Sequence, residues 1–236
     1  MTNQILLHLY SLSYRSTDSK RPLMRWLSNF FVKITPVPNL AGDRDVEWSW
    51  IVAHLDESSG NALDVGGGQS NLGLVAALRG YKATVVDLTN VKRFYAHSNL
   101  SFIQNDLFNI DLPDSSFDLI IACSTVEHIG LPRYGGDYDM NADLRAMSLL
   151  RRLVKPNGTM LMTIPVGKDK VVFPEHRVYG SKRLPMLLDG WDTEKKDFFI
   201  KDIDNKWIAA NEYETLNQNP TRYYYGLGLF ILKPKC

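Results

Sequence analysis

A glycine-rich turn between a strand and a helix is the feature that most restricts the fold of this chain. Residues 62–73 read ALDVGGGQSNLG, so a short apolar strand enters three glycines and a helix follows. Glycines carry no side chain, so a ligand can approach the backbone amides of this turn closely. A second strand, ATVVD, ends on Asp87, 23 residues after Asp64. In dinucleotide folds an acid at that place binds ribose hydroxyls, so the pattern predicts a cofactor that contains ribose.

The spacing of the glycines argues against a dinucleotide. The fingerprint G-x-G-x-x-G needs a glycine three positions after its second one, and Asn71 stands there. Asp64, two residues before the first glycine, would repel a pyrophosphate but suits a positively charged cofactor such as a sulfonium. A glycine-rich turn alone is equally typical of a simple tight connection, so the downstream segments decide.

Composition restricts the class of protein. With 236 residues, 44% of them hydrophobic and 22% charged, the chain fits one globular domain with a full core. The net charge of +1 gives no electrostatic footprint for nucleic acid. Cys123 and Cys236 fit neither a disulfide framework nor a zinc cluster, so a cytoplasmic location is expected. No apolar stretch has membrane-spanning length and no basic region precedes the short ILLHLY run, so we expect neither a transmembrane segment nor a signal peptide.

The N-terminal 40 residues differ from the rest in charge. They hold five basic residues against one acid, a net charge of +4, which leaves −3 for the remainder. Behind Pro22 an apolar stripe recurs at helical spacing, formed by Leu23, Met24, Trp26, Leu27, Phe30 and Phe31. We expect residues 1–40 to form a basic and aromatic arm that packs on its own domain or on a homodimer partner, with peripheral membrane contact as the alternative. Residues 41–236 then form the main domain.

Strands and helices alternate along that domain. Strands are expected at 61–65, 82–87, 101–104, 117–122, 159–164, 197–209 and 224–232, and helices at 45–55, 71–79, 141–154 and 181–189, with a helical or irregular stretch at 90–96. This order predicts an α/β, doubly wound, Rossmann-like fold with a mostly parallel sheet of seven strands. The last two strands have no long helix between them, so they are expected to form an antiparallel hairpin at one edge.

From residue 60 to 236 the chain resembles the class I S-adenosylmethionine-dependent methyltransferases. The glycine turn matches their motif I, except that Ser70 replaces a glycine of many members, and Asp87 matches their ribose acid. Asn105-Asp106-Leu107, VEHIG at 126–130 and RRLVKPNGTMLMTIP at 151–165 match further segments of the family. The resemblance implies S-adenosylmethionine as cofactor, and it implies a binding site formed by Asp64, Gly66, Gly67, Gly68, Asp87, Leu88, Asp106, Leu107 and Ser124.

Two long loops are expected at the carboxyl ends of strands, where ligands bind in open α/β sheets. Residues 124–141 read STVEHIGLPRYGGDYDMN and residues 166–180 read VGKDKVVFPEHRVYG, a mixture of charged and aromatic residues that suits a polar substrate. Candidate substrate contacts are Glu127, Arg133, Tyr134, Asp137, Glu175, Arg177 and Tyr179. The candidate catalytic bases are His128 and His176, because imidazole titrates near neutral pH.

These observations predict a methyltransferase that modifies an oxygen of a small polar acceptor. The loops, with DGW at 189–191, resemble a little-characterised subgroup associated with bacterial surface-polysaccharide gene clusters, which implies a sugar or a nucleotide-linked sugar. The alternatives are a non-sugar acceptor and a non-catalytic subunit that binds the cofactor. Asp137 and Asp139, with Glu127, would suit Mg²⁺, but alternating acids in a glycine-rich loop are more typical of solvated turns, so no metal is expected.

Overall fold

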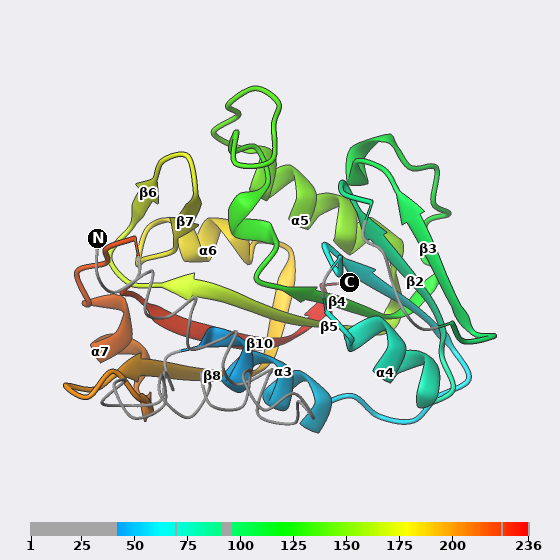
Figure 1. Ribbon diagram of the computed structural model, residues 1–236, viewed down its shortest axis with the longest axis horizontal. Helices are drawn as coiled ribbons and strands as arrows, with labels where there is room; N and C mark the ends of the chain where they lie inside the picture. The colour runs from blue at the N-terminus through cyan, green and yellow to red at the C-terminus, as the bar shows by residue number, and fades with distance from the viewer. Residues whose placement is uncertain (1–41, 69, 91–95, 223, 236) are drawn as a thin grey trace, which may run out of the picture. The chain divides into compact units, whose positions relative to one another are not determined.

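A computed structural model describes residues 42–68, 70–90, 96–222 and 224–235 (Figure 1). The chain divides into two compact units, Met1–Gly42 and Asp43–Cys236, and nearly all of the described residues belong to the second. The expectations for residues 1–40 lie outside the described residues, as does most of the stretch predicted at 90–96.

The domain is built on one mixed sheet of eight strands in the order β3-β2-β1-β4-β5-β10-β8-β9. The first five strands of that order run parallel to one another, and β10 lies antiparallel to β5 and β8. The strands are β1 Asn61–Val65, β2 Lys82–Asp87, β3 Leu100–Gln104, β4 Phe117–Cys123, β5 Val154–Val166, β8 Trp191–Lys201, β9 Trp207–Ala210 and β10 Gly226–Pro234. The predicted α/β class and mostly parallel sheet are confirmed, but the sheet has eight strands where seven were predicted.

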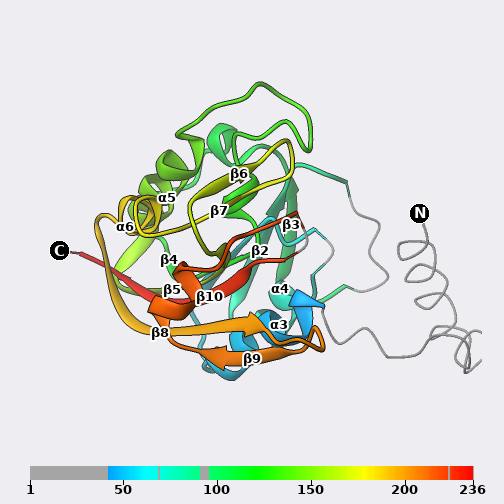
Figure 2. The same cartoon turned by 90° about the vertical axis from the view of Figure 1, so that its left-hand side faces the viewer.

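The missing strand lies inside the segment predicted as one strand at 197–209. The chain turns back at Asn205, whose φ is 64°, so that β8 and β9 pair antiparallel as a hairpin (Figure 2). The antiparallel pairing of the two C-terminal segments is confirmed for β8 and β10. However, β10 inserts between β5 and β8, the short helix α7 Glu212–Leu216 precedes it, and β9 forms the edge.

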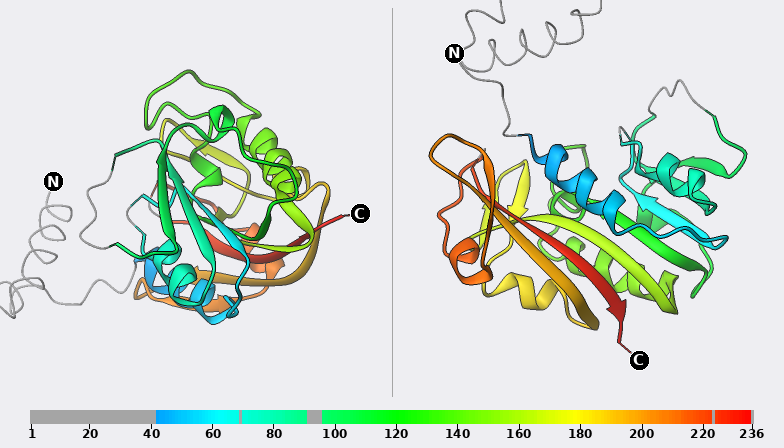
Figure 3. Two further views of the ribbon diagram at one scale, coloured as in Figure 1. Left: turned by 90° about the vertical axis from the view of Figure 1, so that its right-hand side faces the viewer. Right: turned by 90° about the horizontal axis from the view of Figure 1, so that it is seen from below.

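Helices cover both faces of the sheet (Figure 3). The helices α3 Asp43–Ala53 and α4 Leu72–Leu78 pack on one face through Trp50, Ile51, Leu72 and Ala76. On the other face lie α5 Ala142–Leu153 and α6 Arg183–Leu187. The buried residues of α5 recur at positions 146, 147, 150 and 153, which is the spacing of one helix face. No helix in the described part of the chain is long and apolar enough to cross a membrane.

One edge of the sheet gathers the segments that carry the candidate site. The carboxyl ends of β1, β2, β4 and β5 meet there, and so does the start of β10, because Gly226 pairs with Val166. The predicted loop after β5 holds a two-stranded hairpin that sequence reasoning did not foresee, β6 Lys170–Val172 with β7 His176–Val178. Short 3-10 helices follow β3 and β4, namely η1 Leu107–Asn109 and η2 Val126–His128.

Candidate active site

The glycine turn leaves β1 in a conformation that requires glycine. Gly66 has a φ of +69°, which side chains rarely adopt, and a Cβ there would also lie 2.4 Å from Thr125 Oγ1. A Cβ on Gly67 would lie 2.3 Å from Asp64 Oδ2, so the turn is packed directly on that acid. The chain's own side chains therefore pack closely on Gly66 and Gly67, so both positions require glycine for packing as well as for the predicted approach of a ligand.

Asp64 lies beneath the turn. It is 2% exposed, and its Oδ2 accepts hydrogen bonds from the Gly73 amide at 2.9 Å and the Ser70 hydroxyl at 3.3 Å. Gly73 lies in the first turn of α4, where backbone amides lack partners within the helix. The carboxyl group thus fixes the start of α4 against β1.

Asp87 links the second strand to the turn. Its Oδ2 accepts a hydrogen bond from the Gly68 amide at 2.8 Å, and its Oδ1 accepts from the Thr89 amide and hydroxyl at 2.7 and 2.6 Å. A carboxylate has about four lone-pair sites, so the contacts with described residues leave one site on Oδ2. Binding both ribose hydroxyls at this acid therefore requires that the Thr89 hydroxyl turn away. Leu88 follows, 52% exposed.

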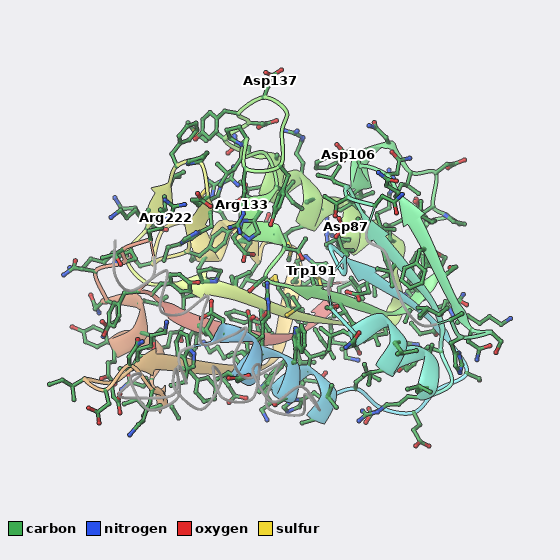
Figure 4. All side chains as sticks on the ribbon, viewed as in Figure 1. Asp87, Asp106, Arg133, Asp137, Trp191 and Arg222 are labelled. Carbon is green, nitrogen blue, oxygen red and sulfur yellow. The ribbon has the colours of Figure 1, made fainter. Side chains whose placement is uncertain are left out.

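Asp106 lies at the end of the neighbouring strand. Its Oδ1 accepts from the Phe108 amide at 2.9 Å and so caps η1, while Leu107 is buried in the core. Because β2 and β3 pair in parallel with Asp87 opposite Gln104, the two acids follow adjacent strand ends. Figure 4 shows both on the same side of the sheet edge.

Glu47 adjoins the candidate site through Ser124 and was not among the residues chosen from the sequence. It is fully buried on α3, and it accepts hydrogen bonds from the Thr163 hydroxyl at 2.7 Å and from the Ser124 hydroxyl. Arg44 donates to it at 2.8 Å. Ser124 itself has a φ of 46°, and its amide donates to the Thr163 carbonyl. The sequence did contain a signal: Glu47 lies three and four positions before the apolar Trp50 and Ile51, which places all three on one face of a helix.

Glu127 and His128 meet in η2 at the end of β4. Glu127 is 1% exposed, and burial raises the pKa of its carboxyl group to about 8. Among the described residues its Oε2 has no hydrogen-bond partner. The His128 Nδ1 donates to the Glu175 carbonyl at 2.6 Å, which leaves Nε2 without a proton in the neutral ring, 3.5 Å from Glu127 Oε1. Burial lowers the pKa of His128 to about 3.

His176 adjoins this pair from β7. Its ring lies 6.3 Å from that of His128 and 5.2 Å from that of Tyr225, between ring centres. Its Nε2 is buried without a hydrogen-bond partner among the described residues, and burial lowers the pKa of the ring. The two histidines that the sequence placed on separate loops are thus neighbours. Both are weaker bases than free imidazole, which contradicts the reason for which they were chosen.

Charged and aromatic side chains form the outer part of the site. Glu175 pairs with Arg133 at 3.5 Å between Oε2 and Nη1, and with Arg222 through its other oxygen. Tyr134 is exposed, and its ring lies 5.8 Å from that of His128. Figure 4 labels Arg133 and Arg222 on this side of the edge, and Asp137 at the outer tip of its loop.

Two predicted substrate contacts lie in the core instead. Arg177 is 1% exposed and donates to the Ile129 and Asp139 carbonyls at 2.6 and 2.8 Å, so its guanidinium holds the loop after β4 in place. Tyr179 is fully buried, and its hydroxyl donates to Asp143 Oδ2 at 3.0 Å. Neither presents its polar group to a substrate, because the guanidinium group and the hydroxyl group already form hydrogen bonds inside the core.

No group of three His, Cys, Asp or Glu side chains in the described ranges is arranged to hold a metal ion. Asp139, which the sequence suggested as a possible metal ligand, pairs with Arg145 at 2.6 Å. The geometry therefore offers a glycine turn with two strand-end acids on one side, and on the other side a buried acid with two neighbouring histidines.

Known proteins share both sequence and fold with the chain. The family described as "Caenorhabditis protein of unknown function, DUF268" matches residues 86–217, more than half of the chain. The "Putative methyltransferase YqeM" of Bacillus subtilis (strain 168) is 24% identical in an alignment of 200 positions that covers 73% of this chain and 77% of that protein.

Solved structures with this fold include two methyltransferases. A Burkholderia thailandensis 1,6-didemethyltoxoflavin-N1-methyltransferase, solved with 1,6-didemethyltoxoflavin and S-adenosylhomocysteine bound, superposes with a TM-score of 0.59 at 13% identity, over 97% of this chain and 90% of its own. A putative methyltransferase from Bacillus halodurans C-125 gives a TM-score of 0.57 at 15% identity, over 81% of this chain and all of its own. The fold is that of S-adenosylmethionine-dependent methyltransferases.

Proposed function

The chain belongs to the family described as "Caenorhabditis protein of unknown function, DUF268", and for this member we propose an S-adenosylmethionine-dependent methyltransferase. It methylates an oxygen of a small polar acceptor, and a sugar or a nucleotide-linked sugar fits best. The similar curated protein and the structural neighbours consistently indicate this enzyme class.

The single observation that carries the proposal is the hydrogen bond from the Gly68 amide to Asp87 Oδ2, which joins the glycine turn to the strand-end acid. A Cβ on Gly68 would lie 2.4 Å from that oxygen, so the turn and the acid form one fixed surface. The residues present fit the cofactor: Asp87 retains an acceptor for ribose, Asp106 lies two residues beyond the end of β3, and Asp64 holds a carboxyl group beneath the turn. When bound, S-adenosylmethionine supplies a methyl group on a sulfonium, which is already activated for displacement.

The acceptor is assigned to the other half of the edge. There Glu127 and His176 each bury a polar atom that has no hydrogen-bond partner among the described residues, and Arg133, Tyr134 and Glu175 add charge and an aromatic face. Because the reaction is a displacement on an activated carbon, the protein mainly aligns the acceptor oxygen and receives its proton. Hydroxyl groups satisfy buried acceptors well, which supports a polyhydroxylated substrate.

A non-sugar acceptor is the second candidate. The Burkholderia thailandensis N1-methyltransferase that shares this fold was solved with 1,6-didemethyltoxoflavin bound. A protein with this fold can also catalyse other chemistry, as the [4+2]-cyclase SpnF does, so a subunit that binds the cofactor without methyl transfer is the third.

Calorimetry with S-adenosylmethionine and with S-adenosylhomocysteine tests the cofactor. Both are expected to bind, and no binding of either at millimolar concentration (about 1 mM) would refute the proposal. Incubation with labelled S-adenosylmethionine and a panel of nucleotide sugars then tests the acceptor. Each nucleotide sugar is compared with the same nucleotide lacking the attached sugar. Label transferred only to sugar-bearing acceptors supports the sugar, and label transferred only to other compounds contradicts it.

A further inference from the structure

We propose that Glu127, and not either histidine, is the general base that takes the proton of the acceptor, while His128 and His176 act as neutral hydrogen-bonding groups beside it. This inference rests on the proposed function. It assigns the proton-accepting step to a residue for which sequence analysis expected only substrate contact.

The position of Glu127 joins the two halves of the site. It lies two residues after Thr125, whose hydroxyl donates to the Val65 carbonyl at 2.9 Å and whose side chain adjoins Gly66. On its other side Glu127 Oε1 lies 3.5 Å from His128 Nε2. Glu127 therefore belongs to a segment that contacts the glycine turn through Thr125, and its own carboxyl group adjoins His128.

A hydroxyl group can contact Glu127 and His128 together. Hydrogen bonds of about 2.8 Å from one oxygen reach two atoms up to about 5.6 Å apart, and the gap between Oε1 and Nε2 is 3.5 Å. The His128 side chain is 15% exposed whereas that of Glu127 is 2% exposed, so an acceptor approaches from the side of His128. The unpartnered Oε2 adds a buried polar atom that a ligand can satisfy.

The histidines are poor proton acceptors in this environment. The Nδ1 proton of His128 is held by the Glu175 carbonyl at 2.6 Å, so a second proton on Nε2 would create a buried cation beside Arg133. Burial lowers the pKa of His128 to about 3 and also lowers that of His176. A neutral His128 Nε2 instead accepts a hydrogen bond and orients the hydroxyl.

Glu127 has the opposite property. Burial raises its pKa to about 8, which matches a base that works near neutral pH. The neighbouring Glu47 on α3 raises it further, while Arg44 on α3 and Arg133 in the loop after η2 lower it. The other titratable groups that face this carboxyl group are His128 in η2, Tyr179 directly after β7 and Tyr225 before β10.

Proton and electron balance favours a buried carboxylate. The acceptor O–H bond breaks and its proton moves to Glu127, while the acceptor oxygen forms a bond to the methyl carbon. The S–CH₃ bond breaks, and its electron pair stays on sulfur. One positive charge, on the sulfonium, and one negative charge, on Glu127, disappear together. A site that excludes water favours this loss of charge, because burial penalises the charged forms.

The test compares how S-adenosylmethionine and S-adenosylhomocysteine bind to the wild-type protein and to Glu127→Gln, by calorimetry near pH 6.5 and near pH 9. Ionised Glu127 attracts the sulfonium but not the neutral thioether. The affinity for S-adenosylmethionine divided by that for S-adenosylhomocysteine should therefore rise between the two pH values in the wild type. This rise should be roughly threefold or more larger than the rise in Glu127→Gln. The amino groups of the ligands titrate in both proteins, so the comparison between variants subtracts their effect. Glu214→Gln, on the exposed first turn of α7, controls for the loss of one charge.

An equal rise in the wild type and in Glu127→Gln would overturn the assignment, whereas failure of both ligands to bind would refute the proposed function itself. Infrared spectroscopy of the wild type gives a second measurement that needs no variant. Near pH 7 a protonated carboxyl band, identified by its absence in Glu127→Gln, should lose intensity with S-adenosylmethionine and keep it with S-adenosylhomocysteine. A response that required added Mg²⁺ would also overturn the assignment, because a metal would then occupy the carboxyl oxygens.

Discussion

Replacing Glu127 with Gln should make the stability of the protein depend differently on pH. The pKa of this carboxyl group is 4.5 in the unfolded chain and about 8 in the folded one. Between those values the folded chain keeps a proton that the unfolded chain releases, so the contribution of Glu127 to stability falls as pH rises. Below about pH 4.5 the group is protonated in both states and this loss is absent.

The magnitude follows from the two pKa values. Each pH unit in that window costs about 1.4 kcal/mol, so from about pH 4.5 to about pH 8 the wild type loses on the order of 4 kcal/mol through this one group. Gln is close in shape and cannot ionise, so Glu127→Gln escapes the loss. Any constant difference in packing or hydrogen bonding between the two side chains shifts the whole curve and leaves its slope unchanged.

Urea unfolding of both proteins at about pH 5, 7 and 9 measures the effect. We expect the free energy of unfolding of Glu127→Gln, relative to wild type, to increase by several kcal/mol across this range, with most of the gain complete near pH 8. Glu214→Gln again serves as the reference for a lost charge. A difference between wild type and Glu127→Gln that stays constant with pH would show that burial does not hold the proton on Glu127, and the reasoning would fail.

Three further substitutions test the site and the core. Asp87→Ala removes the acceptor of the Gly68 amide and of the ribose, so affinity for S-adenosylhomocysteine should fall about tenfold or more by calorimetry; unchanged affinity would remove Asp87 from the site. Gly68→Ala places a methyl group 2.4 Å from Asp87 Oδ2, which should cost about 1 to 3 kcal/mol in urea unfolding and weaken the same ligand; a variant as stable as wild type would contradict the packing described. Arg177→Met should lower the free energy of unfolding by about 3 kcal/mol, because the buried Asp143 loses a partner and two loop carbonyls lose their donor. A variant with full stability that no longer bound the acceptor would instead show that Arg177 contacts the ligand.

Sequence reasoning located the elements that depend on local pattern. The bounds of β1 and β2 were predicted to the residue, and α5 to within one residue at each end. Alternation of strands and helices predicts a parallel sheet, because each connecting helix carries the chain back to the end of the sheet where the preceding strand began. The β8–β9 turn was missed because it depends on Asn205 in the left-handed region rather than on a glycine or proline.

The two long loops follow β4 and β5 at the carboxyl edge of the sheet, as predicted, but several side chains chosen within them are not available to a ligand. Arg177 and Tyr179 were chosen for their chemistry, and both are buried against Asp143, a residue more than thirty positions away. Glu47 was passed over because its partner Ser124 lies 77 residues further along the chain. Such pairs leave no periodic trace in a single sequence. The expected sugar, cytoplasmic location, homodimer and membrane contact of residues 1–40 stay predictions.

The sequence by itself determined the glycine turn after β1 and the acid at the end of β2, and so predicted where a nucleoside cofactor binds, because these are local patterns with local causes. Only the tertiary structure decided which polar groups of the two loops remain available for chemistry. Burial and partners depend on which distant segments pack together, and they set the protonation of Glu127 and the histidines. The acid that sequence analysis counted among substrate contacts thereby became the proposed base.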